Sequence, residues 1–176
     1  MGAVKDPSPV LYFISIISGE RERMESAKVK MTEILGDVEQ ATEPAAFFQT
    51  DYYEREMGKD LSRVFLLFDS LYPRDRLADV KLRTNDVETL FSSGGKRSVN
   101  IDPGYISLEN VILVTTKGYS HRIYLGQGIY GDLTLMYNSG TYRPLEWTYP
   151  DYGSGEAIAL FNGWRAILKE KMRGKG

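Results

Sequence analysis

An α+β fold is the class that this sequence predicts, with a ferredoxin-like βαββαβ core that continues into a C-terminal antiparallel β-meander and a terminal helix. Three observations support this prediction: continuous apolar runs typical of buried strands, two segments with helical periodicity between them, and alternating apolar residues in the second half. The first six elements follow the order of the split βαβ arrangement. Buried strands of this kind also need helices on at least one face of their sheet.

The first half of the chain contains two buried strands and a helix between them. Residues 10–17 and 63–69 are nearly continuous runs of apolar, β-branched and aromatic residues, as expected for strands covered on both faces. Residues 20–35 have apolar residues at three- and four-residue steps and stop before a glycine, which predicts an amphipathic helix. Residues 38–50 contain Pro44, so we interpret them as an edge or bulged strand.

A second helical period follows Pro73 and ends near the glycine pair at 94–95. Asn85 could instead begin a separate short helix as its N-cap, with Glu88 as the capping-box partner. Residues 99–101 form a short apolar stretch, and the Asp-Pro-Gly sequence that follows is typical of a turn.

The second half predicts an antiparallel meander and a last helix. Residues 110–115 form the third buried strand. Residues 121–125, 129–137 and 141–147 alternate more openly and are separated by glycine-containing turns. The final helix is expected from about Ser154.

Length and composition describe one globular domain. The chain has 176 residues, of which 42% are hydrophobic and 26% charged, and no linker or internal repeat divides it. We therefore expect a single domain over residues 1–176, with loosely held ends at about 1–8 and 173–176.

Charge and hydropathy argue against two kinds of partner. The net charge is −2 and the pI about 5.5, so no bulk attraction to nucleic acid or to an anionic membrane is expected. The longest apolar run, 10–17, is far shorter than the roughly 20 residues of a membrane span. Without an apolar signal core or any Cys, the chain predicts a cytoplasmic protein that lacks disulfides and thiolate metal sites.

Three familiar kinds of site, a P-loop, a dinucleotide-binding turn and a zinc site, do not fit the sequence. Residues 94–98 resemble the end of a Walker A loop, but Leu90 stands where a glycine is needed and the segment follows a helix. Residues 126–131 have the glycine spacing of a hairpin and not of a dinucleotide-binding turn. A single histidine disfavours zinc, so no metal ligand is predicted; a carboxylate-bound Mg²⁺ or Ca²⁺ stays open, and the cofactor is unknown.

His121 is the strongest candidate for acid–base chemistry, because its unperturbed pKa lies near neutrality. It begins an alternating strand on the same face as Ile123 and Leu125, and a histidine in line with two core residues is more often structural. Residues 115–117 and Arg122 nevertheless favour a function, since their hydroxyls and cations could hold a phosphate or carboxylate together with the imidazole. Both interpretations stay open.

Further candidates lie in the first half. Asp51 belongs to an acidic and aromatic segment that could supply a general base or could be a solvated connection. Lys81, Asn85 and Glu88 form a polar stripe on a helix, which an ordinary solvated helix face also explains. Thr84 lies on the apolar side of that helix and needs a hydrogen-bond partner.

The remaining candidates lie near predicted turns and in the meander. Asn100 and Asp102 lie where a strand is expected to turn, and an Asx turn explains them equally well. Tyr130 and Tyr152 could contact a ligand or pack over the sheet. The candidate acid–base residues are thus His121, Asp102 and Asp51, and the candidate ligand-binding residues are Lys81, Thr84, Asn85, Asn100, Lys117, Arg122, Tyr130 and Tyr152.

Five groups of residues form a recognisable combination. They are Thr50-Asp-Tyr-Tyr53 with Glu56-Met-Gly58, Lys81-Leu-Arg-Thr-Asn85, Val99-Asn-Ile-Asp-Pro-Gly-Tyr105, His121-Arg-Ile-Tyr-Leu125 with Gly128-Ile-Tyr130, and Thr148-Tyr-Pro-Asp-Tyr152. Over nearly the whole chain, the sequence resembles a family of short bacterial and archaeal proteins known only as a domain of unknown function. The resemblance implies a compact, stand-alone domain and supplies no reaction or ligand. Some relatives are labelled GTP-binding, which the missing Walker A loop does not support.

Our first hypothesis is an enzyme or binding protein for a small molecule or nucleotide that bears a phosphate or carboxylate group. Lys81, Lys117 and Arg122 would bind the anion. His121 would act as acid or base together with Asp102 or Asp51.

Two alternatives come from other classes of protein. Exposed tyrosines from Tyr52 to Tyr152 could stack RNA bases on a ferredoxin-like sheet, although the acidic pI and the lack of a basic-aromatic strand motif disfavour this. An exposed strand of the meander could instead form the interface of a homo-oligomer.

Overall fold

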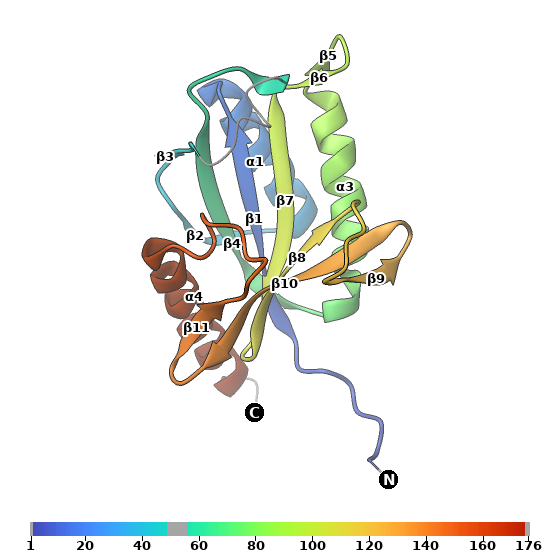
Figure 1. Cartoon of the computed structure of the whole chain (residues 1–176), viewed down its shortest axis with the longest axis vertical. Helices are drawn as coiled ribbons and strands as arrows, with labels where there is room; N and C mark the ends of the chain where they lie inside the picture. The colour runs from blue at the N-terminus through green and yellow to red at the C-terminus, as the bar shows by residue number, and fades with distance from the viewer. Residues whose placement is uncertain (1, 49–55, 175–176) are drawn as a thin grey trace.

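The computed structural model describes residues 2–48 and 56–174, and Figure 1 shows the arrangement of the elements. Over these residues, nine strands form one sheet in which all neighbouring strands are antiparallel, and helices pack against it. The predicted α+β class, with an antiparallel sheet and a terminal helix, is therefore confirmed. No helix in the described ranges is long and apolar enough to cross a membrane.

The elements have the following bounds. The strands of the large sheet are β1 (Val10–Ser18), β2 (Val38–Ala41), β3 (Ala45–Ala46), β4 (Ser62–Tyr72), β7 (Val99–Ile106), β8 (Asn110–Thr115), β9 (Arg122–Gly126), β10 (Ile129–Asn138) and β11 (Thr141–Pro144). The helices are α1 (Arg21–Leu35), α3 (Leu77–Leu90) and α4 (Gly155–Arg173), with a 3-10 turn η1 (Arg74–Arg76) before α3. A small hairpin consists of β5 (Ser92–Ser93) and β6 (Lys96–Arg97).

The centre of the sheet has the strand order β7-β1-β4-β2. The chain reaches β2 from β1 through α1, and it reaches β7 from β4 through α3. β2 is short and its register with β4 shifts between Val38 and Gln40, which agrees with the predicted bulged edge strand. Both predicted helices of this half lie where the periodicity places them.

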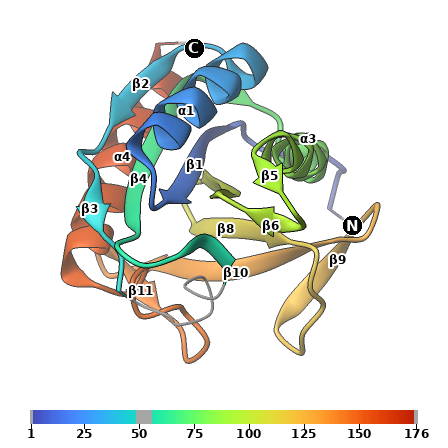
Figure 2. The same cartoon turned by 90° about the horizontal axis from the view of Figure 1, so that it is seen from above.

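Helices cover both faces of the central strands, with α1 and α3 on one face and α4 on the other (Figure 2), and an apolar layer lies beneath the helices on each face. On one face, even-numbered residues of β1 such as Ile14 pack with α1 and α3. On the other face, odd-numbered residues such as Phe13 pack with Phe161 and Trp164 of α4. Because successive side chains of a strand point to opposite faces, a strand covered on both sides is apolar throughout. This explains the continuous apolar run of β1.

The second half of the chain extends the same sheet. β8 pairs with β7, and β10 pairs with β8. The outer edge of β10 is shared, since its first residues pair with β9 and its last residues pair with β11. The predicted meander is therefore present, with β11 ending at Pro144. The final helix begins after Ser154, whose hydroxyl accepts a hydrogen bond from the amide of Ala157.

The predicted turn at Asp102-Pro103-Gly104 is wrong, because β7 continues through these residues. They pair with β1 along their whole length, whereas pairing with β8 stops at Gly104, opposite Leu113. Hydrogen-bonding directions alternate along an antiparallel strand, so Pro103 directs its nitrogen to the same side as Ile101, away from β1. Proline has no N–H to donate, and the ladder with β8 therefore ends there. We call this separation of β8 from β7 the fork.

The alternative of a separate helix beginning at Asn85 is also wrong. α3 is continuous from Leu77 to Leu90, and Asn85 lies in its interior. The segment after α3 forms the β5–β6 hairpin, whose Gly94 and Gly95 both have positive φ angles. This hairpin brings Arg97 beside the end of α3.

Candidate functional site

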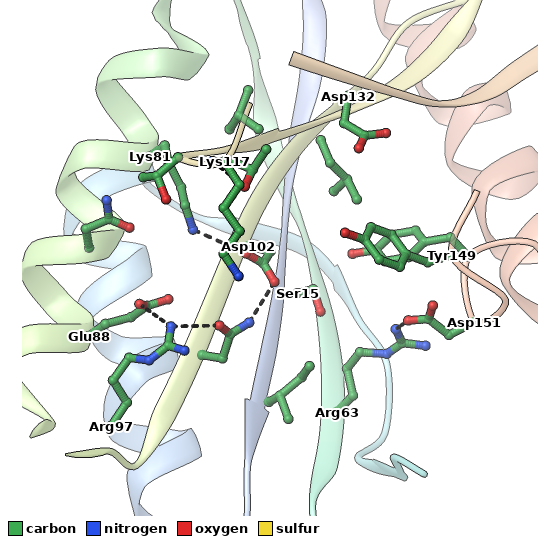
Figure 3. Close-up of a pocket in the computed structure, with 18 of the residues that line it drawn as sticks. Ser15, Arg63, Lys81, Glu88, Arg97, Asp102, Lys117, Asp132, Tyr149 and Asp151 are labelled. Atoms are coloured by element: carbon green, nitrogen blue, oxygen red, sulfur yellow. Dashed lines mark hydrogen bonds and ion pairs between the residues drawn. The ribbon is translucent and has the colours of Figure 1, made fainter. Parts of the chain in front are cut away.

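A pocket of about 650 Å³ lies at the fork, on the α4 side of the central sheet. Its floor is formed where that face becomes polar: Ser15 of β1, Arg63 of β4 and Asp102 of β7 replace the apolar residues found further along the same strands. Ser15 is the register partner of Asp102. Figure 3 shows these side chains directed into the pocket.

One wall is formed by α3, whose side chains reach around the open edge of β7. The Lys81 ammonium donates to the backbone carbonyl of Ile101 at 2.9 Å and lies 3.2 Å from Asp102 Oδ1. Glu88 Oε1 accepts a hydrogen bond from the backbone N–H of Ile101 at 2.6 Å. The two side chains therefore bind the backbone groups of Ile101 that β8 would bind if the ladder continued.

Asp102 is held at both carboxylate oxygens. Lys81 lies beside Oδ1, and the Asn100 amide donates to Oδ2 at 2.6 Å. The Asp102 side chain is 32% exposed, whereas the side chains of the three other acidic residues that line the pocket, Glu88, Asp132 and Asp151, are at most 9% exposed. Among the acidic groups of the described pocket lining, the Asp102 carboxylate is therefore the most accessible to a ligand.

Arg97 joins three parts of the chain below this wall. Its guanidinium donates to both carboxylate oxygens of Glu56 at 2.8 Å, and its Nη1 donates to Glu88 and Asn100 at 3.0 Å. Such a bidentate pair fixes the orientation of the guanidinium as well as balancing its charge. Arg97 thus fixes the Asn100 amide that in turn binds Asp102.

Opposite pKa shifts on the two carboxyl groups bound to Arg97 predict opposite pH dependences of stability. Burial is the largest cause that raises the pKa of Glu88, and the hydrogen bond from Arg97 is the largest cause that lowers the pKa of Glu56. With its folded-state pKa raised, Glu88 contributes stability below about pH 4.5 that is lost as the pH rises. Glu56 has a lowered folded-state pKa, so its contribution is present above about pH 4.5 and is lost as the pH falls.

Urea denaturation of the unmodified chain, Glu88→Gln and Glu56→Gln between about pH 3.5 and pH 7 measures these two contributions. The free energy of unfolding of the unmodified chain, minus that of Glu88→Gln, is expected to decrease with rising pH. The same difference for Glu56→Gln is expected to increase. Slopes of the same sign for the two variants would contradict the opposite pKa shifts.

The wall opposite α3 combines a buried ion pair with aromatic rings. Arg63 pairs with Asp151, and its guanidinium lies over the rings of Phe65 at 4.5 Å and Tyr152 at 5.5 Å. Burial raises the pKa of the Tyr152 hydroxyl well above its usual value, and this hydroxyl hydrogen-bonds with Ser15. Tyr152 therefore stays neutral and acts as a fixed polar group of the floor.

The last wall comes from the ends of β8, β9 and β10. Arg122 donates to Asp132 at 2.8 Å and to the Tyr149 hydroxyl at 2.9 Å. His121 Nε2 lies 3.3 Å from the same carboxylate of Asp132, and its ring stacks on Trp147 with centroids 5.1 Å apart. Asp132 thus joins His121 to the pocket wall.

Most of the candidate ligand-binding residues meet in this pocket. They are Lys81, Asn85, Asn100, Lys117, Arg122 and Tyr152, and the acid–base candidate Asp102 lines the pocket with them. Lys81 and Glu88 are buried, so the solvated helix face suggested for their stripe is wrong. The RNA-binding alternative needs an exposed tyrosine at position 152, but Tyr152 is 5% exposed and packs in the apolar layer, in agreement with the interpretation that it packs over the sheet.

Three predicted residues do not line the pocket. Thr84 is fully buried, and its hydroxyl donates to the Lys81 carbonyl within α3. Tyr130 packs against Tyr124 and beside Gly118. His121 lies behind Asp132, and the expected apolar face shared with Ile123 and Leu125 is wrong, because those two side chains are 72% and 47% exposed. Asp51 lies outside the described residues.

A family model described as a domain of unknown function, DUF4416, matches residues 8–167. The chain belongs to this family. The resemblance found in the five groups of motif residues is thereby confirmed. No curated protein and no solved structure matches the chain.

The matched range contains the whole described pocket lining, including residues that the sequence analysis missed. These are Arg63, Arg97, Asp132 and Asp151, together with Ser15, Phe47 and Tyr149. A polar residue within a buried strand is a usable signal, because burial of a polar group requires a partner. Ser15 within β1 and Asp132 within β10 both have this property. Arg97 gives no comparable signal, since it lies in a short basic hairpin.

This arrangement is suited to binding a polar molecule. Within the described lining, cations from different elements surround a partly accessible carboxylate, with amide and hydroxyl groups between them. Arginine and lysine side chains hold phosphate or carboxylate groups, and Asp102 can accept hydrogen bonds or a proton.

Proposed function

We propose that this pocket binds a small molecule that carries a phosphate or carboxylate group. The main support is that polar side chains from α3, β7, the β8–β9 connection and the segment before α4 line one pocket of about 650 Å³. This volume lies within the usual range of small-molecule sites, roughly 300–1,000 Å³. The segments that supply these side chains lie far apart in the sequence.

Lys117 and Arg122 are the groups we propose for the anion. Both line the pocket on the side of the fork formed by β8 and β9, beside Thr115 and Thr116. Figure 3 shows the Lys117 side chain directed into the pocket. An anion there can accept charge-assisted hydrogen bonds from both cations and from the threonine hydroxyls.

Asp102 is the group we propose for proton transfer if the ligand reacts. It lies on the floor within reach of Lys81 and has the most exposed carboxylate of the described pocket lining. His121 would act indirectly, through its contact with Asp132. This modifies our first hypothesis, in which His121 contacts the ligand itself.

The fold supports a small-molecule site over an RNA-binding sheet. We assign β7-β1-β4-β2 with α1 and α3 to the ferredoxin-like arrangement, because its strand order and the positions of its helices agree with that pattern. RNA-recognition modules of this kind stack bases on the sheet. Here the face opposite α1 and α3 packs against α4, which supports a ligand in the pocket instead.

Binding of an anionic probe is expected to change the fluorescence of Trp147. This residue stacks on His121 and is 38% exposed, while the other tryptophan, Trp164, is buried on the inner face of α4. The probes are ribose 5-phosphate, AMP and citrate. Replacing Lys117 with glutamine is expected to raise the dissociation constant of the probe that binds best by about tenfold, the typical effect of losing one charge-assisted hydrogen bond.

Two controls make this experiment decisive. Lys169→Gln makes the same charge change on an exposed face of α4 and should leave the dissociation constant unchanged. Trp147→Phe should remove the fluorescence signal while calorimetry still detects binding. The proposal fails if none of the three probes binds below about 1 mM, or if Lys117→Gln and Lys169→Gln weaken binding equally.

A further inference from the structure

The charges around the pocket are almost balanced. Among the described lining residues, the basic side chains are those of Arg63, Lys81, Arg97, Lys117 and Arg122, and the acidic side chains are those of Glu88, Asp102, Asp132 and Asp151. Five positive and four negative charges leave one positive charge in the lining, and Glu56, which lies outside the lining, binds Arg97 through both carboxylate oxygens. Each of the four carboxylates lies within ion-pair distance of a basic side chain of the same wall. Such a pocket suits a ligand of low charge and opposes one with several phosphates.

The acceptor capacity of Asp102 points to hydroxyl groups on the ligand. A carboxylate oxygen can accept two hydrogen bonds. Each Asp102 oxygen has one donor in the protein, Lys81 at Oδ1 and Asn100 at Oδ2. Each oxygen can therefore accept one more, and the side chain is 32% exposed. Two adjacent hydroxyl groups of a sugar match the two oxygens of one carboxylate.

From these two observations we infer that the ligand is a sugar monophosphate, with its adjacent hydroxyl groups on Asp102 and its phosphate near Lys117 and Arg122. This inference rests on the proposed function and specifies its ligand class. A phosphate monoester carries a charge of about −1.5 to −2 at pH 7, which is the smallest charge among ligands with a mono-, di- or triphosphate group and so the one that a nearly balanced pocket opposes least. A nucleoside triphosphate carries considerably more and finds no matching excess of cations in the described lining.

A matched pair of ligands tests the role of the hydroxyl groups on the unmodified chain. Ribose 5-phosphate is expected to bind about tenfold more tightly than 2-deoxyribose 5-phosphate in isothermal titration calorimetry, because the second sugar lacks one of the adjacent hydroxyls. AMP is expected to bind at least tenfold more tightly than ATP, measured without divalent cations. The affinities of AMP and ribose 5-phosphate are then compared with each other. Tighter binding of AMP indicates that the ligand is a nucleotide, and tighter binding of ribose 5-phosphate indicates a free sugar phosphate.

The variant Asp102→Asn tests whether Asp102 causes the preference for ribose 5-phosphate over 2-deoxyribose 5-phosphate. In this variant the two pentose phosphates should bind within about threefold of each other, because a neutral amide is a weaker acceptor. The deoxy sugar should bind at least as tightly as to the unmodified chain, since a negative charge is removed. Asp86→Asn, on the exposed face of α3, is the matched control and should keep the tenfold preference.

Three results would overturn the inference: equal binding of the two pentose phosphates to the unmodified chain, an undiminished preference in Asp102→Asn, or tighter binding of ATP than of AMP. Binding of citrate without binding of either pentose phosphate would also overturn it while leaving the proposed function intact. If neither the phosphates nor citrate bind, the proposed function fails as well.

Discussion

Gly104→Ala is expected to lower the free energy of unfolding by about 3 kcal/mol or more, because the added Cβ has no space. It would lie 2.5 Å from the Cζ atom of Phe13 and 2.7 Å from the backbone carbonyl oxygen of Ile112. Phe13 packs against Phe161 and Trp164 of α4, so it cannot move aside without loosening that core. Urea denaturation followed by circular dichroism measures the change.

Gly163→Ala is the matched control for this substitution. Gly163 lies in the exposed part of α4, where an added Cβ meets no atom within 4 Å. Alanine is the better helix former, so a gain of about 0.5–1 kcal/mol is expected. Equal shifts in the two variants would show that the close approach of β1 and β8 at Gly104 has no energetic importance.

Lys81→Met is expected to lower the free energy of unfolding by about 3 kcal/mol, since it removes one partner of a buried ion pair. The Lys81 side chain is 7% exposed, and its loss leaves the carbonyl of Ile101 without its donor and Asp102 without its cation. Asp102 is 32% exposed, so water can take over part of the solvation of its charge. The loss should therefore lie at the lower end of values for buried pairs.

The double variant Lys81→Met/Asp102→Asn tests this explanation. Removing both charges avoids an unpaired carboxylate, so the double variant should be more stable than Lys81→Met alone. Lys30→Met changes a lysine of α1 whose side chain is 42% exposed and pairs with Glu33, and its effect should stay within about 0.5 kcal/mol. A loss below about 0.5 kcal/mol in Lys81→Met would mean that the open edge of β7 does not need the lysine.

The sequence predicted the elements of the fold well because their signals are local. β1 is apolar along its length since both faces are covered, and α4 begins directly after Ser154, where the last helix was expected. The Asp-Pro-Gly segment of β7 was mispredicted for a physical reason. Proline has no N–H to donate, so it is tolerated both in a turn and in a strand at the point where pairing with a neighbouring strand ends. Only the position of the neighbouring strand distinguishes these two cases.

The candidate site was predicted in part, because chemistry-bearing residues are visible in a sequence but their burial is not. Lys81, Asp102 and Arg122 were identified as candidates and do line one pocket. The stripe of Lys81 and Glu88 looked solvated because nothing local shows that β8 leaves β7 and exposes the backbone of Ile101. The contribution of Arg97 depends on Glu56, which is 41 residues away, and on Glu88, which the β5–β6 hairpin brings beside it, so no local pattern predicts it.

The open edge of β7 has a consequence for solubility. Unpaired N–H and C=O groups in a strand are a template onto which a strand of another chain can add, and proteins often protect such edges with inward-pointing charges. Lys81 and Glu88 occupy the backbone groups of Ile101 and place two charges where an incoming strand would have to pair. The same side chains that support the pocket therefore protect the interior edge of the sheet from aggregation.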